Sequence, residues 1–110
     1  MTRHIFPLLV IVFSLVPLSL QAGNWTEFRG PTGQGHAAER NLPIEWTETE
    51  NVAWKVDIAG NGWSSPIVYN GRVYLTASVG RDSSVQSLRT LCLDAANGRE
   101  IWNIEVFHQE

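Results

Sequence analysis

The chain has 110 residues, a formal net charge of −3 and 44% apolar residues. This length allows one small domain, and the composition is not that of a disordered chain. The charges are scattered along the chain, which argues against nucleic acid or an anionic membrane surface as a partner.

The first 22 residues have the layout of a secretory signal peptide. Basic Arg3 precedes an uncharged stretch, residues 5–20, and Ala22 suits a cleavage site. The uncharged stretch is shorter than the roughly 20 residues that span a bilayer, so we favour a signal peptide over a membrane anchor. We expect a periplasmic or secreted protein with no membrane span after cleavage.

Residues 23–50 are rich in Gly, Pro, Thr and Glu and show no sustained period of 2 or 3.6. This pattern predicts an extended N-terminal arm. We expect its Trp25, Phe28 and Trp46 to dock onto something larger. The stretch GPTGQG at residues 30–35 lacks a preceding strand and a following helix pattern, so it does not predict a phosphate-binding loop.

From residue 51 to residue 110 the sequence is mostly strand-like. The stretch VAWKVDI, residues 52–58, alternates apolar and polar side chains and predicts a leading strand with one buried face. The predicted buried face of that strand holds Val52, Trp54, Val56 and Ile58.

Asn70 and Gly71 separate two apolar runs and predict a β-hairpin, because a type I′ turn needs positive φ at both of its central residues. Both faces of the hairpin are apolar, so both should be covered. The expected pairs are Tyr69 with Arg72, Val68 with Val73, Ile67 with Tyr74, and Pro66 with Leu75.

A polar loop is predicted at residues 78–87, followed by strands at 88–94 and 99–107. The last strand is half polar, which suits a sheet edge where charges discourage pairing with other chains. Residues 65–107 therefore read as a four-stranded antiparallel meander in an all-β chain without helices. An inner hairpin that is apolar on both sides is typical of a β-propeller blade stacked between neighbours.

The side chains between the last two strands suit a tight turn of the backbone. Asp94 and Asn97 can accept local backbone N–H bonds, and Gly98 suits a left-handed position. Trp102 then lies on the last strand, where its ring is a large anchor between sheets. Trp54 lies 48 residues earlier in a similar stretch, a spacing within the range of propeller repeats.

Candidate catalytic residues are few. Cys92 is the one cysteine, so it cannot form an internal disulfide, and its place between two leucines predicts a buried side chain. His4, His36 and His108 are isolated in the sequence and have no partner in a recognisable metal motif. We therefore nominate no catalytic, cofactor-binding or metal-binding residue.

The stretch LCLDAANGREIWNIEV resembles the repeat of the pyrroloquinoline-quinone-like (PQQ-like) β-propellers. The matching positions include Asp94, Ala95, Asn97, Gly98 and Trp102. SSPIVYNGRVYLTA is similar to the preceding strand pair of that repeat, and WTEFRGPTGQG to the lead-in of secreted bacterial members. Propellers of this family have seven or eight blades, and the resemblance implies that this chain holds one of them. We therefore expect a fragment that is marginally stable alone and associates through its exposed edges.

The resemblance leaves three functions open. One is a binding or scaffold module, whose partner is another protein or the remaining blades. A second is an N-terminal piece of a quinone-dependent dehydrogenase, which would use PQQ and calcium; the single cysteine departs from that group's vicinal disulfide, and neither Asp57 nor Asp94 matches its catalytic aspartate. A third is a non-functional remnant.

Overall fold

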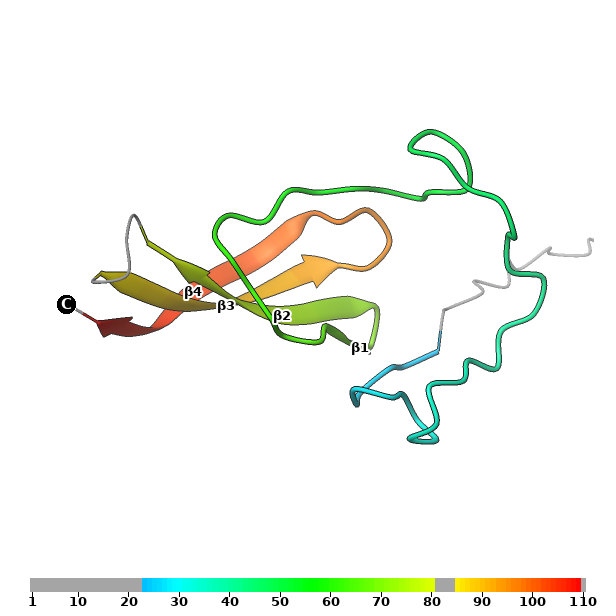
Figure 1. Ribbon diagram of the computed structural model, residues 1–110, viewed down its shortest axis with the longest axis horizontal. Helices are drawn as coiled ribbons and strands as arrows, with labels where there is room; N and C mark the ends of the chain where they lie inside the picture. Colours follow the sequence, from blue (N-terminus) through cyan, green and yellow to red (C-terminus); the bar gives the residue numbers. More distant parts are fainter. Residues whose placement is uncertain (1–22, 81–84, 110) are drawn as a thin grey trace, which may run out of the picture.

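The computed structural model describes residues 23–80 and 85–109, so the predicted signal peptide lies outside the described residues. Within them the protein is all-β, with one open four-stranded antiparallel sheet in the order β1-β2-β3-β4 (Figure 1). The described residues include no helix that could cross a bilayer. The strands are β1 (Ile67–Tyr69), β2 (Arg72–Val79), β3 (Gln86–Asp94) and β4 (Glu100–Gln109).

The hairpin predicted between β1 and β2 is present. Asn70 and Gly71 both have positive φ, 47° and 71°, as a type I′ turn requires. Tyr69 pairs with Arg72, and the next two pairs also follow the expected register. Strand β1 begins after Pro66, whose ring nitrogen has no hydrogen to donate to a ladder.

The two inner strands are longer than the sequence predicts. Strands β2 and β3 extend into the predicted loop 78–87, where Val79 pairs with Ser87. Polar residues can continue a ladder because the ladder is made by backbone groups.

The turn between β3 and β4 has the expected bonds: Asp94 Oδ1 accepts the Ala96 N–H at 2.8 Å, and Asn97 Oδ1 accepts the Arg99 N–H at 2.9 Å.

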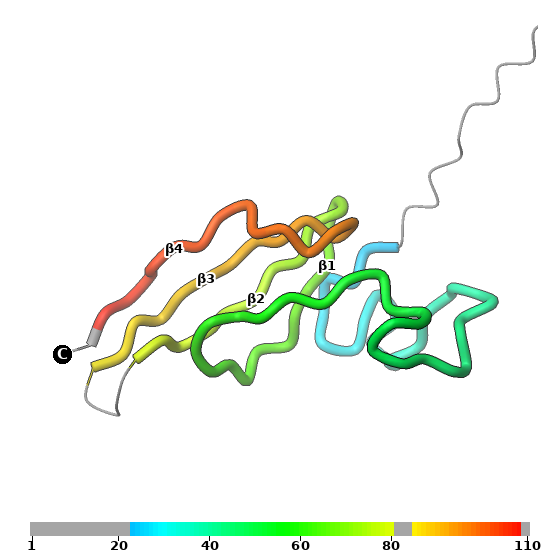
Figure 2. Tube along the Cα trace, turned by 90° about the horizontal axis from the view of Figure 1, so that it is seen from above, coloured from blue at the N-terminus to red at the C-terminus, as the bar shows by residue number. Residues whose placement is uncertain are grey.

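The leading strand predicted for residues 52–58 is wrong, because this stretch belongs to no strand. It is an extended segment that runs along the sheet from the β3–β4 turn, and we call it the crossing segment (Figures 1 and 2). Val52 and Val56 are exposed, whereas Trp54 and Ile58 are half-buried. The segment forms no ladder with a neighbouring strand, so side-chain packing holds it instead.

The crossing segment lies over one face of the sheet, which we call the covered face. Ile58 lines a small cavity together with Leu75 and Ala77, and Leu91 on β3 is only 2% exposed. Directly opposed residues of neighbouring strands share a face, so the register defines the set. The apolar residues of the covered face are Val68, Val73, Leu75, Ala77, Val79, Leu91 and Leu93.

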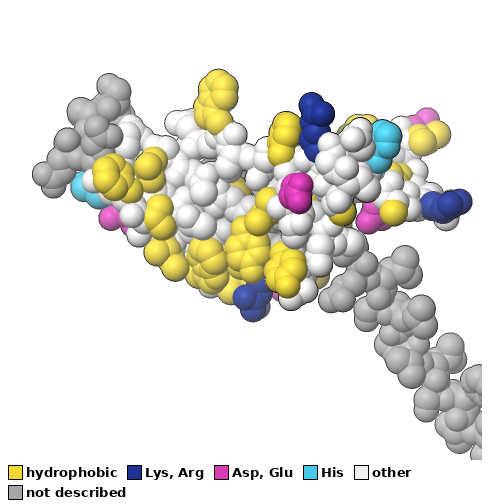
Figure 3. Space-filling view, turned by 90° about the horizontal axis from the view of Figure 1, so that it is seen from below, with side chains coloured by type: hydrophobic (Ala, Val, Ile, Leu, Met, Phe, Trp, Pro, Cys, Tyr) yellow, Lys and Arg dark blue, Asp and Glu magenta, His cyan; other side chains and the backbone are white. Residues whose placement is uncertain are grey.

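The opposite face, which we call the open face, differs from the expectation that both faces are covered. Leu88, Ile104 and Phe107 on this face are exposed. Figure 3, seen from the side away from the crossing segment, shows hydrophobic side chains gathered in a row along the sheet. The apolar and aromatic residues of the open face are Ile67, Tyr69, Tyr74, Leu88, Cys92, Trp102, Ile104 and Phe107.

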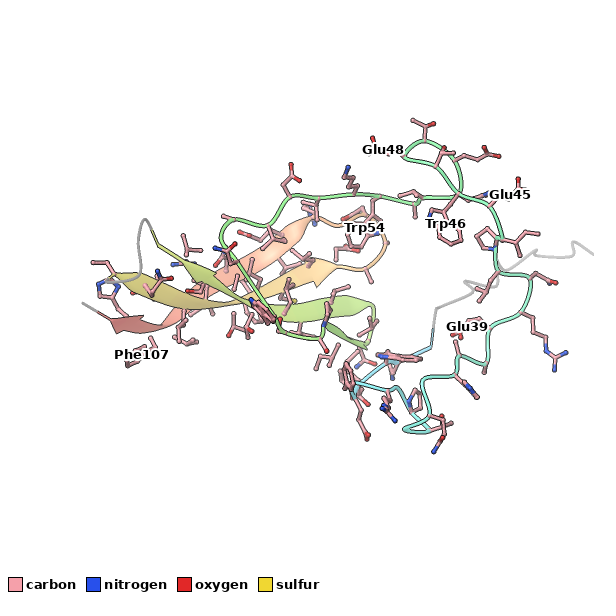
Figure 4. The ribbon with its side chains drawn as sticks, viewed as in Figure 1. Glu39, Glu45, Trp46, Glu48, Trp54 and Phe107 are labelled. Atoms are coloured by element: carbon pink, nitrogen blue, oxygen red, sulfur yellow. The ribbon has the colours of Figure 1, made fainter. Side chains whose placement is uncertain are left out.

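The N-terminal arm docks onto the sheet through Trp25. Its N–H donates to the Val68 carbonyl at 2.8 Å, and the Val68 N–H donates back at 2.7 Å. Phe28 and Trp46, which the sequence also predicts to dock, are exposed. Figure 4 shows Trp46 on the arm, away from the strands. The arm therefore contacts the β1 edge of the sheet and leaves two of its three aromatic side chains in solvent.

Candidate functional site

The β3–β4 turn is held by Trp54 of the crossing segment (Figure 4). The indole Nε1–H of Trp54 donates to the Ala95 carbonyl at 2.9 Å. Gly98 lies under the ring, and a Cβ placed there would come within 2.5 Å of it. The structure thus brings together three residues of the predicted repeat, Trp54, Ala95 and Gly98. Their arrangement is a packing contact that fixes the crossing segment over the sheet.

Trp102, the other tryptophan of the predicted repeat, lies on the open face. Its ring centroid is 6.1 Å from that of Tyr74, and the two rings are tilted by 51°. Cys92 pairs with both residues in the ladder and is fully buried, as the sequence predicts. A thiol without access to solvent is inert toward external substrates. This part of the open face is therefore a packed aromatic cluster.

Beyond that cluster the open face is an apolar surface. Leu88 on β3 is 43% exposed and Ile104 on β4 is 53% exposed, and Phe107 continues the surface along β4. Thr90 lies between them in the ladder, paired with Ile104. Grouped apolar side chains of this kind mark surfaces that bind other proteins. The open face is the candidate functional site of this protein.

A polar cluster lies on the same side of the sheet as the covered face. Arg89 Nε donates to Asn103 Oδ1 at 2.6 Å, and Arg89 Nη1 lies 3.8 Å from Glu105 Oε2. His108, which is isolated in the sequence, lies with its Nδ1 3.8 Å from the same carboxylate oxygen. No sequence spacing indicates this contact, because it depends on where β4 runs beside β3.

The polar cluster is centred on the carboxylate of Glu105. The Ser87 hydroxyl donates to this carboxylate, and Arg89 and His108 face it as well. Among residues 23–80 and 85–109, no group of three or more His, Cys, Asp or Glu side chains is placed to hold a metal ion. The cluster is best explained as cross-strand pairing that fixes β4 against β3.

A groove of about 430 Å³ lies where the chain after the crossing segment meets β2 and β3. Ala77 and Leu88 line it, together with Trp63, whose side chain is fully exposed. Its one charged lining residue, Arg89, is already bonded to Asn103. The sequence does not single out Trp63, since one aromatic residue among glycines and serines has no periodic signal.

Comparison of the chain with protein-family models, with curated proteins and with solved structures found no match.

Proposed function

We propose that this chain is an exported protein that contributes one sheet of a PQQ-like β-propeller and acts as a binding or scaffold module. The observation that carries the proposal is the open face, an apolar surface on the side of the sheet opposite the crossing segment. A sheet with one covered and one exposed apolar face has a natural place in a stack of sheets. The partner is then another protein or the remaining blades.

Three further features support the proposal. The strands follow one another in an up-and-down order, which is that of a propeller blade. The Asp94 to Gly98 turn has the side-chain-to-backbone bonds that the resembling repeat needs. The N-terminal sequence supports export to the periplasm or the medium.

The absence of a nominated catalytic group favours binding over catalysis. Cys92 is buried, and the carboxylate of Glu105 is engaged by Ser87 and faces Arg89 and His108. The polar side chains on the covered side of the sheet thus bond to one another across β3 and β4. A scaffold needs only a shaped apolar surface, which the chain has.

Quinone titration of the purified chain separates binding from dehydrogenase chemistry. With PQQ, calcium and an alcohol substrate, we expect no reduction of an artificial electron acceptor, because the open face that carries the proposal is an apolar surface. A known quinone-dependent dehydrogenase under the same conditions is the positive control. Calcium-dependent dye reduction by this chain would overturn the proposal in favour of the dehydrogenase.

A further inference from the structure

The two edges of the sheet differ in whether other described segments pair with them. At the β1 side, Trp25 bridges Val68, and Asn61 bridges Ser78 further along β2. The Ser64 hydroxyl also bonds the N–H and the carbonyl of Thr76, both at 3.1 Å. At the other side, no strand or bridge within residues 23–80 and 85–109 pairs with the outer edge of β4. A strand of ten residues with an unpaired edge is a template for another strand.

The sequence of β4 is complementary to itself in one antiparallel register. A two-fold axis that relates two antiparallel edge strands is perpendicular to the sheet, so paired residues share a face and the axis passes through a residue position. With the axis at Ile104, a carboxylate lies opposite a histidine, apolar residues lie opposite apolar residues, and the remaining polar residues lie opposite each other. The pairs are Glu100 with His108, Ile101 with Phe107, Trp102 with Val106, Asn103 with Glu105, and Ile104 with itself.

Neighbouring centres lack this complementarity. An axis at Glu105 sets two carboxylates directly opposite each other, which destabilises a pair. An axis at Asn103 sets Glu100 against Val106 and Glu105 against Ile101. The charges of β4 therefore discourage those pairings and favour one. The part of β4 around Ile104, from Trp102 to Glu105, is also where the β3–β4 ladder runs without a register shift.

We propose that two copies of this chain pair through the outer edges of β4, antiparallel and with the two-fold axis at Ile104. The seam contains two Glu100–His108 pairs, one on each side of the axis. Exposed apolar side chains, Ile104 at 53% and Val106 at 62%, line it between them. The pairing uses a sheet edge, whereas the proposed scaffold function uses the open face, so either proposal can fail without the other.

Cysteine cross-linking in the full chain tests the axis position. Ile104→Cys places two thiols opposite each other, within about 4.5–5.5 Å between Cβ atoms, close enough for a disulfide after small adjustment. Val106→Cys is the matched control, because its opposite residue is Trp102 of the second copy. Cys92 is buried and does not compete. We expect mild oxidation to give a covalent dimer of Ile104→Cys at least about tenfold faster than of Val106→Cys; equal rates overturn the proposal.

A charge exchange tests the register, with the dimer Kd measured by sedimentation. His108→Glu sets two carboxylates opposite each other at two places in the dimer, and Glu100→Lys removes the carboxylate that accepts from the imidazole, so each is expected to raise the Kd, His108→Glu by about tenfold. The double variant pairs opposite charges and is expected to return close to the parent value. The proposal is overturned if the parent chain is monomeric, or if it forms aggregates whose size does not change with these substitutions. It is also overturned if the double variant dimerises as weakly as the single variants.

Discussion

Gly98→Ala is expected to destabilise the protein by about 3 kcal/mol, with about 1–2 kcal/mol from the left-handed backbone and the rest from displacement of the Trp54 ring. Gly98 is buried and has a φ of 72°, and a new Cβ would lie 2.5 Å from that ring. Displacing the ring also breaks the bond from its Nε1–H to Ala95. Urea unfolding followed by circular dichroism measures the loss.

Gly71→Ala is the matched control for that change. Gly71 has nearly the same φ, 71°, but no atom lies within 4 Å of the position that a Cβ would take. It is therefore expected to cost only the backbone strain, about 1–2 kcal/mol. The difference between the two variants isolates the contact with Trp54. Equal losses in the free energy of unfolding would mean that the indole does not hold the turn.

Leu91→Ala is expected to cost about 2–5 kcal/mol, the usual range for a buried leucine that leaves a cavity. Leu91 is 2% exposed beneath the crossing segment. Leu88→Ala, on the open face of the same strand, removes the same atoms from a side chain that is 43% exposed. It is expected to cost about 1 kcal/mol in the isolated chain, since roughly half of its burial is absent.

The comparison of these two leucines also reports on the open face. Both variants are measured in the purified full chain by urea unfolding, with the free energy of unfolding as the quantity compared. A loss at Leu88 as large as that at Leu91 would show that the open face is already buried in the purified protein. That result would contradict the assignment of one covered and one open face.

Local features of the fold were predictable from the sequence. The Asn70–Gly71 turn fixes its own register, because a two-residue loop leaves one way to pair the flanking strands. The burial of Cys92 followed from its alternation with two leucines on a central strand. The bonds of Asp94 and Asn97 are local and depend only on neighbours in the chain.

Long-range features were not predictable in the same way. The alternation at residues 52–58 is the same whether or not a strand pairs with it, so it could not show that the crossing segment packs by side chains alone. The bond of Trp54 with Ala95 joins residues 41 positions apart. The register shifts of β4 opposite Cys92 and Leu88 also have no sequence signal, and they change which side chains share the open face.

The candidate site was predictable in kind but not in detail. The sequence indicated an apolar ribbon covered on both sides, and the structure has one covered side and one exposed side. Which side remains exposed depends on the path of the crossing segment. The contact of His108 with Glu105 likewise depends on the position of β4 beside β3.

Thiol labelling of Leu88→Cys tests most directly whether the open face is a binding surface. The rate is measured in exporting cells and in the purified full chain, with Lys55→Cys as the control on the crossing segment, on the other side of the sheet, where the side chain is 69% exposed. A binding surface predicts that Leu88→Cys reacts at least about tenfold more slowly in the cells, while Lys55→Cys reacts equally in both. Equal rates for Leu88→Cys in the two settings would contradict the account.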